Sequence, residues 1–227
     1  MDEALTSLIA AAVTFVGTHF ALSHPLRAPL VKAVGDKGFQ GVYSLVALAS
    51  FVWMVTAFRA IAPAEPLWEG MADLPWIIAT VLMLPASVLL VGSFIGNPAM
   101  QMPGAAAAAA RGPHGVFHTT RHPMMWSFAL WSAAHLLVSP TPRVIVLSLT
   151  IALLALIGAH LQDRKKQTQM GATWAGWEAQ TSYWPKLAAL SRAGALPWLG
   201  GIALWLAASW MHGWLIALPA GVWRWLG

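Results

Sequence analysis

Residues 144–161 read VIVLSLTIALLALIGAHL, a stretch of 18 residues without a single carboxylate, lysine or arginine. The apolar residues run continuously instead of alternating with polar ones, which favours a helix over a membrane strand. A hydrocarbon core of about 30 Å needs roughly 20 apolar residues in a helix. This stretch therefore predicts a transmembrane helix, and the rest of the chain can be tested against the same criterion.

The composition of the whole chain agrees with a membrane protein. Of its 227 residues, 58% are hydrophobic and only 9% are charged, whereas a soluble domain carries about 25% charged residues. An ordinary soluble enzyme and a disordered chain are thereby excluded. The chain has 14 Trp and no Cys, which excludes disulfides, thiolate-bound iron–sulfur clusters and a cysteine nucleophile. The net charge of +5 reflects loop topology, so no nucleic-acid partner is expected.

Six stretches meet the length criterion, although the fourth is short. They are residues 5–22, 39–62, 74–95, 123–138, 144–161 and 196–218. The sequence thus predicts an all-α fold, a polytopic transmembrane helix bundle of about six helices. We expect one integral membrane domain over residues 1–227, with inner loops at 23–38, 96–121 and 162–192.

The basic residues predict the orientation, because cytoplasmic loops of membrane proteins are enriched in Lys and Arg. With the N-terminus outside, ten of the 13 basic residues lie on the inner side. They are Arg27, Lys32, Lys37, Arg111, Arg121, Arg164, Lys165, Lys166, Lys186 and Arg192. The sequence therefore predicts an N-out, multi-pass membrane protein, with lipid as a partner.

Two of the inner segments have features of their own. The alanine run at 105–110 predicts a short connecting helix, because alanine has the highest helix propensity. The segment 162–192 begins with basic residues and continues with Trp174, Trp177 and Trp184. That order is typical of a helix lying at the membrane interface. We expect Asp163, which stands beside the basic residues at the start of this segment, to belong to a solvated helix end.

Eight histidines stand out in a chain with so few polar residues. Ionisable side chains inside membrane segments are costly and usually functional. At 1.5 Å per residue, His19 lies roughly 21 Å inward from Leu5. On the same scale, His135 lies about 18 Å from Pro123, deep on an otherwise apolar helix. Most of the other imidazoles belong to the inner half of the bundle.

Two kinds of metal site are compatible with these histidines. His114, His118 and His122 are four residues apart and would align on one helix as ligands for iron or zinc, but Pro123 disfavours the helical conformation of the residue before it. Alternatively, two histidines on different helices hold a haem iron. Neutral imidazoles, absent thiols and few carboxylates suit haem b as that group.

An ordered set of motifs extends from about His19 to Pro185. Its main members are Gly17-Thr18-His19, Leu26-Arg27, Asn97-Pro98, Gly115-Val116-Phe117-His118-Thr119-Thr120-Arg121-His122-Pro123, Trp131 with His135, His160, Asp163-Arg164-Lys165 and Trp177-Glu178. This set resembles the NnrU family of bacterial membrane proteins, to which the membrane-bound zeta-carotene isomerase is related. The resemblance implies the bacterial inner (cytoplasmic) membrane as its location.

The resemblance implies a metalloprotein with iron as the metal. NnrU proteins are associated with nitric oxide and nitrite reduction in denitrification, and the related isomerase holds haem b through two histidines and isomerises a cis double bond of a carotene. Those two ligands match His19 and His135, which the resemblance makes the catalytic and metal-binding residues. His122 or His160 would replace His135 as ligand if His135 is a packing residue. Ser132 stands where the isomerase has a cysteine that exchanges with histidine as ligand.

Other residues and partners complete this expectation. Arg121, and secondly Arg27, are candidates to bind a haem propionate, because guanidinium pairs well with carboxylates. A hydrophobic small molecule or nitric oxide is the expected ligand, and a respiratory complex is a possible partner. Two alternatives stay open: a membrane methyltransferase of the isoprenylcysteine methyltransferase type, and a non-catalytic assembly factor for a respiratory reductase.

Overall fold

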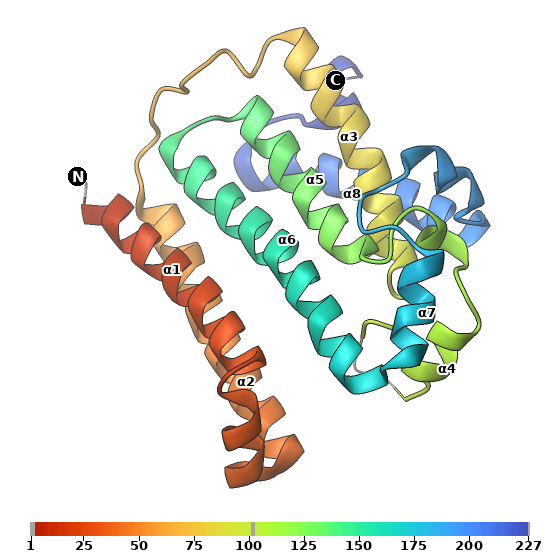
Figure 1. Cartoon of the computed structure of the whole chain (residues 1–227). Helices are drawn as coiled ribbons and strands as arrows, with labels where there is room; N and C mark the ends of the chain where they lie inside the picture. The colour runs from red at the N-terminus through yellow and green to blue at the C-terminus, as the bar shows by residue number, and fades with distance from the viewer. Residues whose placement is uncertain (1–2, 101–102, 227) are drawn as a thin grey trace.

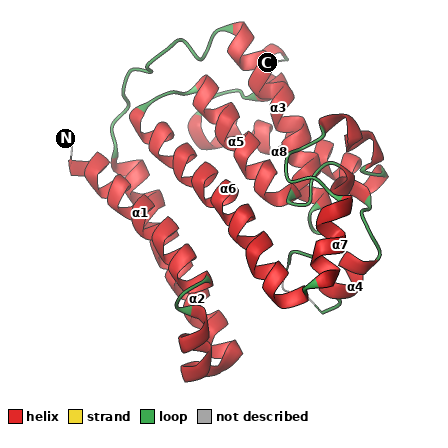
Figure 2. Ribbon diagram, viewed as in Figure 1, coloured by secondary structure: helices red, strands yellow, loops and turns green. Residues whose placement is uncertain are grey.

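The computed structural model describes residues 3–100 and 103–226, and every regular element within these ranges is a helix (Figure 2). Six of the helices are apolar: α1 (Glu3–Ser23), α2 (Arg27–Ala60), α3 (Asp73–Gly92), α5 (Pro123–Val138), α6 (Pro142–Met170) and α8 (Ala195–Ile216). Five are long and apolar enough to cross a membrane, and α5 is a shorter apolar helix. The predicted all-α, polytopic bundle of about six helices is confirmed, whereas its orientation stays a prediction.

The remaining elements are short: α4 (Ala105–Ala110), η1 (Gly115–His118), α7 (Ala172–Gln180), η2 (Leu187–Arg192) and η3 (Gly221–Trp225). The predicted alanine helix is confirmed as α4. Residues 101 and 102 of the predicted loop 96–121 lie outside the described residues, as do residues 1, 2 and 227 of the predicted domain.

The apolar helices pack in the order α2, α1, α6, α5, α3 and α8 (Figure 1). Each neighbouring pair is in contact, so α6 stands between α1 and α5. The short helix α7 packs against both α4 and α6, and η1 packs against η2. These short elements form a compact lobe at one end of α3, α5 and α6 (Figure 1).

Two helices extend beyond their predicted bounds. α2 begins at Arg27 instead of residue 39, and α6 continues to Met170 instead of ending at 161. The predicted inner loop 23–38 is therefore largely helical, interrupted at Gly35, whose φ of 72° and ψ of 169° are not helical. An apolar window locates only the part of a helix that lipid surrounds, so polar extensions of the same helix are missed.

The buried residues form two clusters. One lies between α1 and α2 and contains Leu8, Ala11, Ala12, Met54, Ala57 and Ile61. The other joins α3 and α5 to the compact lobe and contains Val88, Leu89, Ala99, Ala109, Val116, Phe117, Trp126, Trp174, Trp177, Leu190 and Ala193. Trp174 and Trp177 are completely buried among protein side chains, so these two residues do not face lipid, whereas the interfacial position of the segment 162–192 stays a prediction.

The contact between α3 and α8 depends on a small residue. A Cβ atom added to Gly201 would lie 2.7 Å from the Cα of Val88, closer than real side chains approach a backbone. Small residues allow this close approach of helices in a membrane, where burial from water contributes little to their association. Gly201 is therefore a packing residue of the second cluster.

Candidate functional site

A large cavity of about 530 Å³ opens between α1, α2, α5 and α6. Its walls are mainly apolar, with Phe15, Phe20, Phe51, Met54, Met125, Phe128, Ile151 and Leu154 among the lining residues. Its polar lining residues are His19, Ser23, His24, Tyr43, Gln162, Lys165 and Lys166. The volume lies within the usual range of small-molecule sites, and the combination of apolar walls with few polar groups is typical of them.

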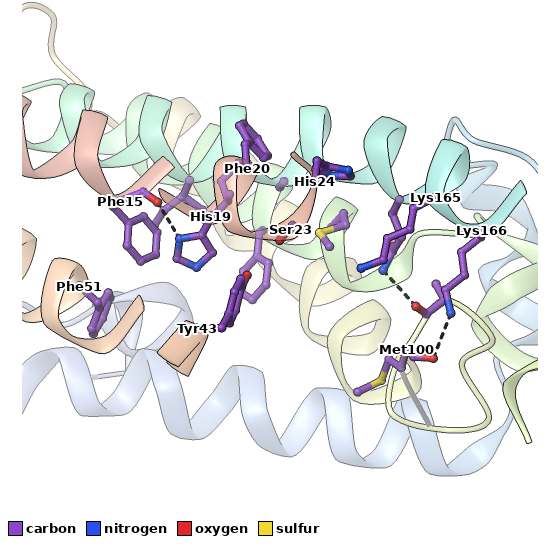
Figure 3. A pocket seen from close by; sticks show the side chains of 18 of the residues that line it. Phe15, His19, Phe20, Ser23, His24, Tyr43, Phe51, Met100, Lys165 and Lys166 are labelled. Carbon is purple, nitrogen blue, oxygen red and sulfur yellow. Dashed lines mark hydrogen bonds between the residues drawn. The ribbon is translucent and has the colours of Figure 1, made fainter. Parts of the chain in front are cut away.

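His19 presents its imidazole to this cavity beside Phe15 and Tyr43 (Figure 3). Its Nδ1 donates a hydrogen bond to the carbonyl oxygen of Phe15 at 2.6 Å. The ring centroid lies 4.3 Å from that of Phe15 and 5.6 Å from that of Tyr43. Because Nδ1 carries the proton, Nε2 keeps a lone pair, and the described part of the chain offers it no hydrogen-bond donor. An imidazole anchored in this way is preorganised to bind a metal.

His135 lies elsewhere in the bundle. Its ring stacks on Trp131 at 4.0 Å, lies 6.1 Å from the His212 ring and is not among the residues that line the large cavity. Phe128, the lining residue of α5 nearest to His135 in the sequence, stands seven residues earlier, and seven helical residues span about 10.5 Å. The structure therefore does not bring His19 and His135 into one pocket, and their shared coordination of one metal stays a prediction.

The approach of His135 to His212 was not expected from the sequence. It requires α8, which packs on α3, to bring its far end near that of α5. Nothing in the local sequence around His212 indicates a partner 77 positions away, because no periodicity relates the two helices. This pair is a feature that only the packing order creates.

Arg121 and His122 belong to a buried ion-pair network on Asp163 of α6. Arg121 donates from Nε and Nη2 to the two carboxylate oxygens at 2.7–3.1 Å. His122 Nε2 donates to the same carboxylate at 2.8 Å, and its ring is completely buried. Glu178 of α7 lies 3.6 Å from Arg121 Nη2. We call these four residues the Arg121–Asp163 network; it corrects the solvated helix end expected at Asp163.

Tyr183 covers this network. Its ring lies 5.5 Å from the Arg121 Cζ and 5.6 Å from the His122 ring. Burial and the Asp163 carboxylate raise the pKa of the Tyr183 phenol, while Arg121 opposes that shift. The phenol therefore stays neutral and donates a hydrogen bond to the carbonyl oxygen of Leu156 at 2.8 Å.

Of the other predicted site residues, neither Arg27 nor Arg121 lines the large cavity. Among the described residues, the histidine that lines it beside His19 is His24. Arg121 is committed to carboxylates, and Arg27 lines a smaller cavity next to the large one. Of the predicted substitutes for His135, His160 is exposed and His122 is bound to Asp163. Burial, and secondly the Lys165 charge, lower the pKa of His24, so its imidazole is neutral at pH 7.

The three histidines spaced four apart do not share a helix. His118 ends η1, and α5 begins only at Pro123, with His122 at φ −120° and ψ 57°. Within residues 3–100 and 103–226, no group of three His, Cys, Asp or Glu side chains is arranged to hold a metal ion. The alternative iron or zinc site at 114–122 is therefore not supported, because the proline starts a new helix where the old one would have to continue.

The fold and the cavity define a class: a polytopic helical membrane protein with an imidazole facing an apolar, ligand-sized cavity. Comparison with protein families then identifies the family within this class. The model of the family described as "NnrU protein" matches residues 7–220, so the chain belongs to the NnrU family, as the motifs of its sequence indicate. No curated protein and no solved structure gave a significant match.

Proposed function

We propose that this NnrU protein binds haem b in the large cavity, with His19 as an axial ligand, and acts as a redox or gas-binding component linked to nitric oxide or nitrite reduction. The observation that supports the proposal is the His19 imidazole, fixed through Nδ1 to the backbone and offering Nε2 to an apolar cavity of about 530 Å³. Bound haem would supply an iron centre that changes oxidation state and binds small gases.

The residues of the cavity fit such a group. Phe15, Tyr43 and Phe51 are flat rings suited to contact a porphyrin face. Lys165 and Lys166 lie toward one end of the cavity, away from Phe15 and Phe51 (Figure 3), where positive charge suits carboxylates. Apolar walls exclude water from the iron side, which changes the redox potential and gas affinity of a haem.

A zeta-carotene-isomerase-like reaction is the finer alternative carried by the family resemblance. Ser132 cannot supply the thiolate that the isomerase uses, and it donates instead to the carbonyl oxygen of Phe128 at 2.9 Å. His135 would have to serve as the opposite ligand, yet it lies beside Trp131 and His212. We therefore favour a haem that His19 would hold and that would supply an iron centre able to bind nitric oxide.

The test is the absorbance of the full chain purified in detergent and supplied with haem, in the oxidised state and after dithionite. We expect a haem spectrum from the wild type, its loss in His19→Ala, and its retention in the matched control His160→Ala, whose side chain is exposed. We also expect His135→Ala to keep the haem. Loss of haem in His135→Ala would instead support the two-histidine site, and a wild type that binds no haem would contradict the proposal.

A further inference from the structure

A small cavity of about 230 Å³ adjoins the large one at the end where α1 gives way to α2. The two cavities share the lining residues Ser23, Tyr43 and Lys165. The small cavity differs in chemistry, since its other lining residues include Arg27, Gln40 and Ser44. The two cavities are therefore neighbours, and the smaller one is the more polar.

The positive charges of the small cavity lack an adequate counter-ion. Lys165 is close enough to Arg27 and Lys166 to be repelled by both. Lys166 donates to the carbonyl oxygen of Met100 at 3.3 Å, whereas Lys165 makes no hydrogen bond or ion pair within the described residues. Asp36 lies 3.7 Å from Arg27 Nη2, but its side chain is 73% exposed. Such a pair contributes little, because water screens it.

Arg27 also has an unused donor. Its Nε is buried and finds no hydrogen-bond partner among the described residues, while its guanidinium lies 5.3 Å from the centre of the Phe39 ring. An unpaired buried donor of a charged group is costly unless a ligand satisfies it. Arg121 shows the opposite state, since two of its nitrogens are bonded to Asp163.

We propose that the small cavity binds an oxyanion, a carboxylate or a phosphate, carried by an amphiphile whose apolar body occupies the large cavity. Arg27 would donate to it from its guanidinium, Lys165 would neutralise it from α6, and the hydroxyls of Ser23, Tyr43 and Ser44 are available as further donors. The oxyanion has two sources: a haem propionate, which rests on the proposed function, or the phosphate of an anionic phospholipid, which does not.

The test compares Arg27→Gln/Lys165→Gln with a charge-matched control, Lys186→Gln/Arg192→Gln, whose side chains are exposed. In the lipid arm, native mass spectrometry measures binding of phosphatidylglycerol and phosphatidylcholine to the purified full chain without haem. In the haem arm, titrations compare haem b with its dimethyl ester, which lacks the carboxylates. Thermal unfolding checks that both double variants are folded. If Arg27→Gln/Lys165→Gln is not folded, the single variant Lys165→Gln replaces it.

We expect the wild type and the control to prefer one of the two anionic probes over its neutral partner by about tenfold or more, and the cavity variant to lose that preference. A preference in the lipid arm identifies an anionic phospholipid as the source, since the phosphate of phosphatidylcholine is balanced by its choline charge, and one in the haem arm identifies the propionate. If neither haem nor its ester binds, the proposed function fails while the lipid arm still decides the oxyanion site. A cavity variant that matches the control in both arms overturns the inference.

Discussion

The two halves of this molecule satisfy their polar groups differently. In the compact lobe, Arg121 and His122 both donate to Asp163, and a tyrosine covers them. Along α1, α2 and α6, in contrast, the described residues give His19 Nε2 and Arg27 Nε no hydrogen-bond partner at the walls of the two cavities. The lobe also holds buried polar atoms without a partner, among them His122 Nδ1 and the Nε1 atoms of Trp174 and Trp177, so the contrast concerns the arginines: Arg121 is paired within the lobe, whereas our proposals assign a ligand to Arg27.

The largest effect should follow the removal of the shared carboxylate. Asp163→Ala removes the shared carboxylate from the buried His122 and from Arg121, which keeps only the longer approach of 3.6 Å to Glu178, and breaking a buried ion pair in this way costs about 3–5 kcal/mol. Unfolding in detergent should show the loss, or the variant should fail to accumulate. The control is Asp36→Ala, which removes the exposed ion pair between Asp36 and Arg27 and should cost under about 1 kcal/mol. Equal effects of the two changes would mean that the network does not stabilise the lobe.

A smaller loss is expected where α3 and α8 touch. Gly201→Leu places a side chain against the Val88 backbone, and overpacking of a close contact costs about 1–3 kcal/mol. Gly213→Leu on the same helix is the matched control, because a Cβ at Gly213 meets nothing within 4 Å. Thermal unfolding distinguishes them. If Gly213→Leu proves as harmful, the close approach at Gly201 is not what holds α8 to α3.

His19 should matter far less for stability than Asp163 does. His19→Ala removes one hydrogen bond, to the Phe15 carbonyl, and in the absence of ligand we expect a loss of about 0.5–1.5 kcal/mol in the free energy of unfolding. Unfolding of the haem-free protein measures it. A collapse comparable to that of Asp163→Ala would assign His19 to the structural half of the molecule and weaken the case for a ligand site.

The smallest effect is a pH dependence at the mouth of the large cavity. Burial and Lys165 hold the pKa of His24 in the folded protein below its ordinary value of 6.5. Between this lowered pKa and 6.5, the unfolded chain therefore binds more protons than the folded one. The contribution of His24 to stability is therefore complete above pH 6.5 and declines as the pH falls below it. NMR titration of the imidazole should place its pKa below 6.5, and Lys165→Gln should raise it. A wild-type pKa at or above 6.5 would contradict this.

The membrane helices could be predicted from the sequence because lipid imposes a local rule: each span needs an apolar run of sufficient length. The fourth span, 123–138, is α5 with the predicted bounds, and Pro123 explains its start. The polar start of α2 at Arg27 and the end of α6 at Met170 were missed, since helices outside the lipid obey no such rule. The family could also be recognised from the sequence, because the order of its motifs along the chain does not depend on how the helices pack.

The candidate functional residues also divide into those that the sequence indicates and those that only the packing of the helices brings together. The sequence alone determined that the chain is helical with spans apolar enough to cross a membrane, and it indicated His19 as a candidate ligand, because hydropathy and helical rise act along the chain. Only the tertiary structure decided that Asp163 binds Arg121 and His122, that His135 faces His212, and that Arg27 and Lys165 share a cavity. Those outcomes depend on which helices pack side by side, and contacts between distant segments leave no periodic signal in one sequence.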